Sequence, residues 1–216
     1  MKSMKSFLSA FKYAFHVFPM HILGRPFNGF DRMKHEKQGS MAFCLFVLFL
    51  SCILNVLEYV YNGFLINYND LYQVSTLYLM LVTAFPVFLF VTGNWSVTTL
   101  LNGEGKYHEI FMVTMYALYP FCLCRIAALL LSNVLLLDEM AIVSAIRGIG
   151  VALFVFYLFV GLVVIHNYGF GQGIGMVLLT LFAIMVIVFV LMLGFSLVAD
   201  VFDFLRTVLR ELRLRL

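Results

Sequence analysis

Long apolar segments separated by short polar ones dominate the chain. A helix needs about 20 mostly apolar residues to cross the hydrocarbon core of a bilayer. Segments of roughly this length occupy residues 41–57, 72–93, 110–137, 142–165 and 174–199. Because lipid offers no hydrogen-bonding partners, each segment must form a helix whose backbone groups bond one another. The pattern therefore predicts an all-α fold, a polytopic transmembrane bundle of five helices.

The N-terminal segment is amphipathic instead of uniformly apolar. Between residues 7 and 18, apolar and aromatic side chains recur at helical spacing on one side, opposite Lys5, Lys12 and His16. Pro19 is expected to end this helix, and residues 21–40 are expected to form a turn-rich loop. We predict an interfacial helix lying among the lipid headgroups. The alternative is a helix packed against the spanning helices.

The C-terminal tail carries a second amphipathic pattern. Val201, Leu205, Val208 and Leu212 lie on the side opposite a Glu211–Arg215 pair at i,i+4 spacing. If the N-terminus is cytoplasmic, as argued in the next paragraph, five spans place this tail on the other side of the membrane. The tail nevertheless contains four arginines, which favour the cytoplasmic side. Either the tail folds back as an interfacial helix, with Gly194 as a possible break, or the number of spans differs by one. The side of the C-terminus stays open.

The distribution of basic residues predicts the orientation. Seven lysines and arginines precede the first span, whereas the loop at residues 58–71 has none. The positive-inside rule then places the N-terminus in the cytoplasm of a multi-pass protein of the cell membrane. Because the basic residues flank the membrane, the net charge of +3 does not indicate a nucleic-acid partner. We expect one domain over residues 1–216, with an interfacial segment at 1–39, the bundle at 40–205 and a basic tail at 206–216.

The segment between the second and third spans is the most distinctive part of the chain. Trp95 is the only tryptophan, and its ring suits the membrane–water boundary. Residues 95–101 predict a short interfacial helix. Residues 102–105, Asn-Gly-Glu-Gly, predict a tight turn, because asparagine and glycine adopt positive φ at low cost. Pro120 lies within the third span and is expected to bend it.

This segment carries a resemblance to a known family. The matching positions are Asn94, Trp95, Thr98, Gly103, Gly105, Tyr107, Tyr116, Leu118 and Pro120. The segment resembles the signature of the Yip family, the Ypt/Rab-interacting five-span membrane proteins, and residues 26–40 resemble its bacterial branch. The resemblance implies a five-helix bundle with a cytoplasmic N-terminus and implies no enzymatic activity. The long cytosolic N-terminal extension of many eukaryotic members has no counterpart in this sequence, so we expect no Rab-binding role.

One arginine lies near the middle of a predicted span. Placing an arginine at the bilayer centre costs roughly 2.5–3.5 kcal/mol on insertion scales, so Arg125 is expected to face the bundle interior. Its candidate partners are Glu58 at the end of the first span and Asp200 or Asp203 at the end of the fifth. Two interpretations follow. The arginine either belongs to a structural ion pair or binds a ligand such as a lipid phosphate.

The sequence offers no catalytic or metal-binding pattern. The four cysteines lie in apolar spans without the spacing of metal ligands, His108 and Glu109 are adjacent, and His166 stands alone at a span end. Glycines at 169, 171, 173 and 175 predict a flexible connection between the last two spans. We therefore expect no enzymatic activity, no cofactor and no metal.

Two functions remain. The first is a non-catalytic integral membrane protein that acts as a scaffold or as a regulatory or accessory subunit, with the lipid bilayer and another membrane protein as partners. The alternative is a transporter or channel subunit, for example one associated with an ABC-type permease, in which Arg125 lines a path for an anion or a lipid headgroup.

Overall fold

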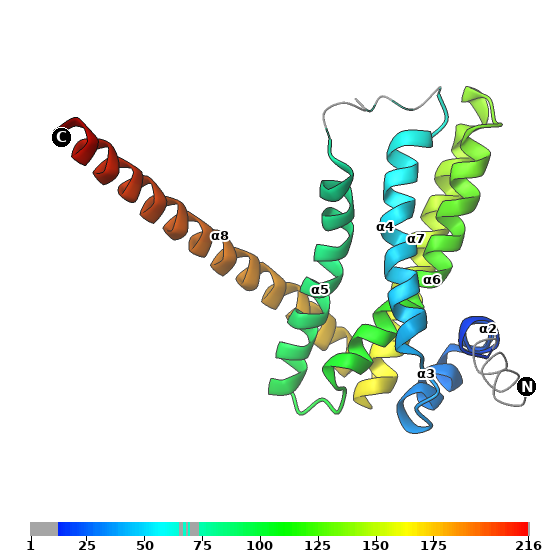
Figure 1. Cartoon of the computed structure of the whole chain (residues 1–216). Helices are drawn as coiled ribbons and strands as arrows, with labels where there is room; N and C mark the ends of the chain where they lie inside the picture. The colour runs from blue at the N-terminus through cyan, green and yellow to red at the C-terminus, as the bar shows by residue number, and fades with distance from the viewer. Residues whose placement is uncertain (1–12, 65–66, 68, 70–73, 216) are drawn as a thin grey trace, which may run out of the picture.

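Five long helices form most of the structure. The computed structural model describes residues 13–64, 67, 69 and 74–215, and Figure 1 shows the whole chain. The helices long and apolar enough to span a membrane are α4 (Met41–Tyr61), α5 (Thr76–Leu100), α6 (Tyr107–Ser132), α7 (Met140–His166) and α8 (Phe170–Arg215). The predicted all-α fold with five spanning helices is confirmed.

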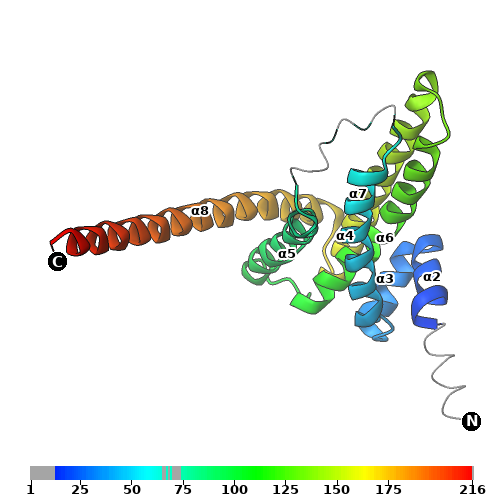
Figure 2. The same cartoon turned by 45° about the horizontal axis from the view of Figure 1, so that its top comes forward.

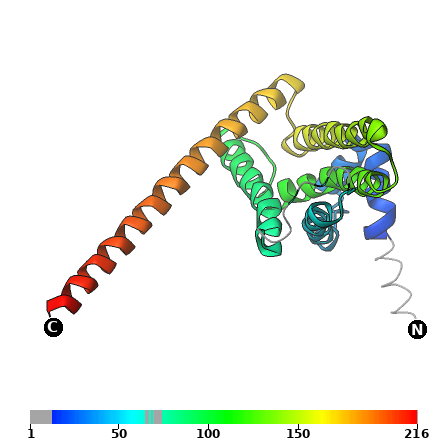
Figure 3. The same ribbon diagram turned by 90° about the horizontal axis from the view of Figure 1, so that it is seen from above.

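Helix α6 is the centre of the bundle. It packs against α4 and α7, which flank it in the view from above (Figure 3). Every side chain from Ile110 to Leu118 is buried, so this part of α6 is surrounded on all sides. On α7, a Cβ at Gly161 would lie 2.5 Å from a methyl of Val113. The absence of a side chain there lets the two backbones approach closely, as is common between membrane helices.

Two short helices cover one end of the bundle, and here one sequence prediction was wrong. The chain forms a π-helical turn at Tyr13–Val17, then α2 (Phe18–Gly24) and α3 (Pro26–His35), which lie across that end (Figures 1 and 2). Residues 21–40 are thus mostly helical. Proline is well tolerated in the first turn of a helix, so Pro19 and Pro26 begin helices instead of ending them.

The described part of the N-terminal segment packs against the spanning helices. Phe18, Ile22 and Phe30 are almost fully buried. The hydroxyl of Tyr157 on α7 donates to the carbonyl of Leu23 at 2.6 Å. The residues of the predicted interfacial helix up to residue 12 lie outside the described residues.

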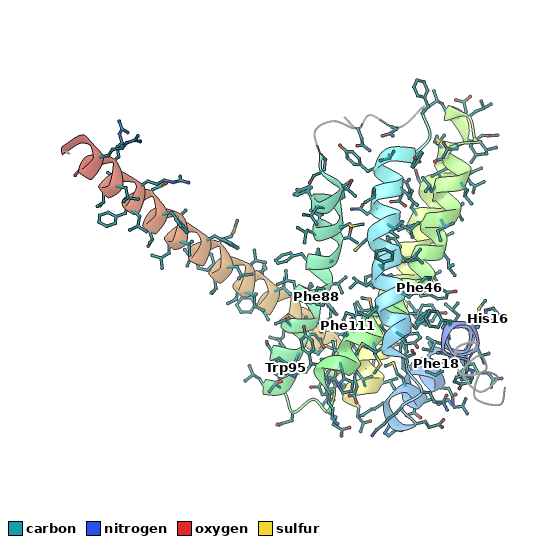
Figure 4. All side chains as sticks on the ribbon, in the orientation of Figure 1. His16, Phe18, Phe46, Phe88, Trp95 and Phe111 are labelled. Atoms are coloured by element: carbon teal, nitrogen blue, oxygen red, sulfur yellow. The ribbon has the colours of Figure 1, made fainter. Side chains whose placement is uncertain are left out.

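Helix α5 runs further than predicted. Its last turns include residues 95–100, so the separate interfacial helix expected there does not exist. Ser75 caps the N-terminus of α5 by accepting a hydrogen bond from the backbone N–H of Tyr78. Phe88 of α5 stacks on Phe111 of α6 with ring centres 5.9 Å apart (Figure 4), which joins α5 to the core.

Helix α8 is a single helix of 46 residues, about 69 Å long at 1.5 Å per residue. It does not break at Gly194, and it already includes residues 170–175, which were predicted to be a flexible connection. Only residues 167–169 separate it from α7. Gly173 packs against α7, where its Cβ would lie 2.6 Å from Val163. Helix α8 then packs against α5, where a Cβ at Gly93 would lie 2.8 Å from Ile184, and beyond this contact it leaves the bundle at a steep angle (Figures 1 and 3).

Candidate functional site

A polar cluster lies inside the bundle where α5 and α7 end. Asn94, on α5, is fully buried. Its amide nitrogen donates to the hydroxyl of Thr180 on α8 at 3.0 Å and contacts the sulfur of Met176 at 2.9 Å. Its amide oxygen lies 3.3 Å from Nε2 of His166, the last residue of α7. One carboxamide therefore joins three spanning helices.

The hydrogen bonds of His166 define its tautomer. Its Nδ1 atom accepts the backbone N–H of Gly105 at 3.2 Å, so this nitrogen carries no proton. The neutral ring then bears its proton on Nε2, which donates to the amide oxygen of Asn94. The ring of Tyr168 stacks on the imidazole at 5.4 Å, and its hydroxyl donates to the carbonyl of Leu101. The end of α7 is thus fixed to the α5–α6 loop.

The two glycines of the α5–α6 loop make room for this histidine. A Cβ at Gly103 would lie 2.7 Å from Nδ1 of His166, and a Cβ at Gly105 would lie 2.6 Å from its Cε1. Neither glycine has positive φ. Asn102 takes the left-handed conformation instead, with φ of 55°. The predicted turn exists, but its glycines are needed for space and not for backbone torsion.

Thr98 completes the cluster, which we call the motif cluster: Asn94, Thr98, Gly103, Gly105, His166 and Thr180. The buried Thr98 hydroxyl donates to the carbonyl of Asn94 at 2.8 Å, and the Thr98 carbonyl accepts the N–H of Gly103 at 2.8 Å. Sequence reasoning identified the residues before α6 but missed His166 and Thr180. The paired glycines were the available signal, since glycine often marks the close approach of another group.

An ion pair outside the bundle ties α3 to the same loop. The ammonium group of Lys34 lies 2.5 Å from the carboxylate of Glu104. The hydrogen bond and the charge of Lys34 lower the pKa of Glu104 below its usual 4.5. Asn167 at the C-cap of α7, with φ of 56°, adds a further hydrogen bond to this carboxylate. Helix α3, the loop and the end of α7 are therefore linked.

Trp95 and Tyr107 form an aromatic pair on the outside of the same region. Their rings meet edge to face with centres 6.1 Å apart. Trp95 is 43% exposed and Tyr107 is 40% exposed. The hydroxyl of Tyr107 lies 3.4 Å from that of Thr92. Figure 4 places Trp95 near the end of α5. Half-exposed amphipathic rings at a helix end are typical of the membrane interface.

Tyr116 holds the N-terminal helices in place. Its buried hydroxyl accepts the backbone N–H of Ser40, the N-cap of α4, at 3.2 Å. Its ring stacks on Phe43 at 4.8 Å and meets Phe18 edge to face at 5.5 Å. Leu118 and Pro120 are buried in α6, which stays helical through the proline.

Arg125 lies against Glu58, one of its three candidate partners. Its Nε and Nη2 atoms donate to the two carboxylate oxygens at 3.0 and 2.7 Å, a bidentate arrangement. The side chains are 11% and 19% exposed. The guanidinium also lies over the ring of Phe121, 5.5 Å from its centre. The charge of Arg125 is thus met within the bundle, between α4 and α6.

The other two candidates lie elsewhere. Asp200 and Asp203 are exposed on the distal part of α8, which projects away from the bundle (Figure 1). Asp203 pairs with Arg206 of the same helix at 3.4 Å. The prediction that either aspartate partners Arg125 does not hold, because α8 remains straight past Gly194 and does not fold back.

The motif cluster connects its helices by hydrogen bonds, and the Arg125–Glu58 pair connects its helices by an ion pair. Among the described residues, no three His, Cys, Asp or Glu side chains lie together as metal ligands would. The motif cluster joins α5, α7 and α8 to the α5–α6 loop, and the Arg125–Glu58 pair joins α4 to α6.

Comparison with known families identifies the family of the chain. The model of the Yip1 domain matches residues 20–192. The chain belongs to the Yip1 domain family. A search of curated proteins found no significant match, and a search of solved structures found none either.

The matched region contains both the motif cluster and the Arg125–Glu58 pair. It begins within α2 and ends within α8, so the Yip1 domain includes all five spanning helices. With these helices and this family, the chain is a multi-pass membrane protein of the Yip1 type. The distal part of α8, from residue 193, lies beyond the matched region.

Proposed function

We propose that this Yip1 protein is a non-catalytic scaffold or accessory subunit that holds a second integral membrane protein along α8. The observation that carries the proposal is the isolation of the C-terminal part of this helix, from Phe189 onward. Every described side chain of α8 from Phe189 onward is exposed. A helix of about 69 Å is more than twice the roughly 30 Å hydrocarbon thickness.

The charges of distal α8 favour a protein partner over lipid alone. The surface carries Asp200, Asp203 and Glu211 as well as Arg206, Arg210 and Arg213, so charges of both signs are present. A helix that binds only anionic headgroups typically carries mainly basic residues on its polar face. Mixed charges beside a wide apolar face are typical of a helix that packs against other helices.

Site-specific photo-crosslinking in native membranes tests this proposal. A photoreactive amino acid replaces Phe202 on distal α8 or, as a matched control, Phe49 on α4, each 59% exposed in the chain. We expect position 202 to yield one protein adduct in near-stoichiometric amount and position 49 to yield lipid adducts. Lipid adducts alone at both positions would contradict the proposal.

The orientation completes the proposal. Helix α3, the segment that follows it and the α5–α6 loop lie at one end of the bundle and carry Arg32, Lys34, Lys37 and Lys106. By the positive-inside rule, we propose that this end and the N-terminus face the cytoplasm of a cell-membrane protein.

The alternative of a transporter or channel subunit is the weaker of the two. It needs Arg125 to be free for an anion or a lipid headgroup, and Glu58 takes up both of the guanidinium contacts described above. Loss of flux in liposomes on Arg125→Leu, with the fold intact, would revive this alternative.

A further inference from the structure

A pocket of ≈ 370 Å³ lies between the end of α3, the segment leading into α4 and the first turn of α6. Neither the motif cluster nor the Arg125–Glu58 pair contributes to it. Its polar lining comes from Lys37, Lys106, His108 and Glu109, and its apolar lining comes from Met33, Met41 and Met112.

The charge of the pocket is positive. Lys37 and Lys106 supply two ammonium groups, and no carboxylate of a described residue forms an ion pair with either. The single acid, Glu109, already accepts the backbone N–H of Lys106 at 2.9 Å and lies 3.9 Å from His108. The two lysines are therefore available to an anion.

The backbone around the pocket is specialised. Lys37 has φ of 53°, in the left-handed region that residues with a side chain rarely adopt. Lys37 directly follows Glu36, the C-cap of α3, where a helix commonly ends in this conformation, so the turn sets where the Lys37 side chain leaves the chain. Two residues on, a Cβ at Gly39 would lie 2.8 Å from Met33 and 3.0 Å from the sulfur of Met112. A glycine at this position keeps the methionine wall close to the chain.

The position of the pocket selects the anion. Met41 is the first residue of α4 and Lys106 is the N-cap of α6, so the pocket lies where two spanning helices begin. This is the depth of lipid headgroups. Methionine side chains are apolar and adaptable, and they suit the glycerol and first acyl carbons of a lipid. Basic pockets between membrane helices bind acidic headgroups.

We propose that this pocket binds the phosphate of an anionic phospholipid from the leaflet at the α3 end of the bundle. Lys37 and Lys106 contact the phosphate, and the three methionines contact the glycerol region. The site is separate from α8, so this inference does not depend on the proposed scaffold function.

Native mass spectrometry of the purified full-length protein tests the proposal. The protein in detergent is titrated with phosphatidylglycerol, with phosphatidylcholine and with inorganic phosphate. We expect one phosphatidylglycerol to bind in preference to phosphatidylcholine. Lys37→Gln/Lys106→Gln is expected to weaken this binding roughly 30-fold, because each lysine near an anionic lipid contributes about 1 kcal/mol, or about 2 kcal/mol for the pair.

A control with the same loss of charge separates a pocket from general attraction. Arg25→Gln/Arg32→Gln removes two cations at the same end that do not line the pocket. It should leave the affinity within about twofold of wild type, because solvent and salt screen charges that do not contact the bound phosphate. Equal loss in both double variants would overturn the proposal, as would equal binding of the two lipids. Saturable binding of inorganic phosphate without lipid preference would overturn the lipid assignment. All four lysines and arginines are partly or fully exposed, so both variants are expected to fold.

Discussion

Nε2 of His166 lies 3.3 Å from the amide oxygen of Asn94, although 72 residues separate them in the chain. This contact joins the end of α7 to α5, and the amide nitrogen of the same asparagine continues the connection to Thr180 on α8. One buried polar cluster therefore fixes α5, α7 and the start of α8 relative to one another, and so sets the direction in which the exposed part of α8 leaves the bundle.

Removing the Asn94 carboxamide should loosen this joint. Asn94→Ala leaves the buried Nε2 of His166 without its partner and removes the donor to Thr180, whose hydroxyl keeps its bond to the carbonyl of Met176. We expect a loss of about 1–3 kcal/mol in the free energy of unfolding. Thermal unfolding in detergent measures it. Ser96→Ala is the control, because among the described residues the Ser96 hydroxyl bonds only the carbonyl of Thr92 in its own helix. Equal effects of the two substitutions would contradict the assigned role.

Alanine at either loop glycine should be destabilising for steric reasons. At Gly103 or Gly105 the new methyl would overlap His166, and overpacking of this kind costs about 1–3 kcal/mol. Gly175→Ala is the matched control, since a Cβ there meets no described atom outside its own turn of α8 within 4 Å, and alanine favours a helix. We expect a lower melting temperature for the loop variants and an unchanged or higher one for the control.

Much of the fold could be predicted because membrane spans follow from length and apolar composition. The five spans needed no tertiary information. The residues at which the helices begin and end were harder to predict. The two prolines that begin α2 and α3 look the same in the sequence as prolines that end helices, and residues 95–100 continue α5 because nothing in them interrupts it.

The candidate site was only half predictable. Residues near one another in sequence, from Asn94 to Gly105, could be grouped by their distinctive pattern. His166 and Thr180 join them through tertiary contacts between helices, and a single histidine at a span end gives no local sign of its partner. The choice among Glu58, Asp200 and Asp203 likewise depended on whether α8 turned back, which Gly194 left undecided.

Replacing one residue of the buried Arg125–Glu58 ion pair should lower the free energy of unfolding more than replacing both residues. Arg125→Leu leaves Glu58 charged and unpaired, and we expect a loss of about 3–5 kcal/mol. The double variant Arg125→Leu/Glu58→Leu should recover most of that loss, because no uncompensated charge remains. Unfolding of both single variants and the double variant forms a mutant cycle. A double variant as unstable as the sum of the singles would argue against the pairing.

Acid should weaken the link between α3 and the α5–α6 loop. Because Lys34 lowers the pKa of Glu104 in the folded protein, the pair contributes its full stability above the usual pKa of 4.5. This contribution is lost as the pH falls through the lowered folded pKa. We expect the melting temperatures of wild type and Glu104→Gln to differ slightly at neutral pH and to converge below pH 4.5. A constant difference over the whole pH range would contradict this assignment.

The Arg125–Glu58 pair also bears on the order of membrane insertion. Glu58 lies on α4, 67 residues before Arg125, and so it is synthesised and threaded into the bilayer first. When α6 leaves the translocation channel, the carboxylate that neutralises its arginine is already in the membrane. Without a partner, Arg125 would oppose the insertion of α6. Glu58 on α4 can pair with it as α6 enters, so the order of synthesis favours assembly of α6 onto α4.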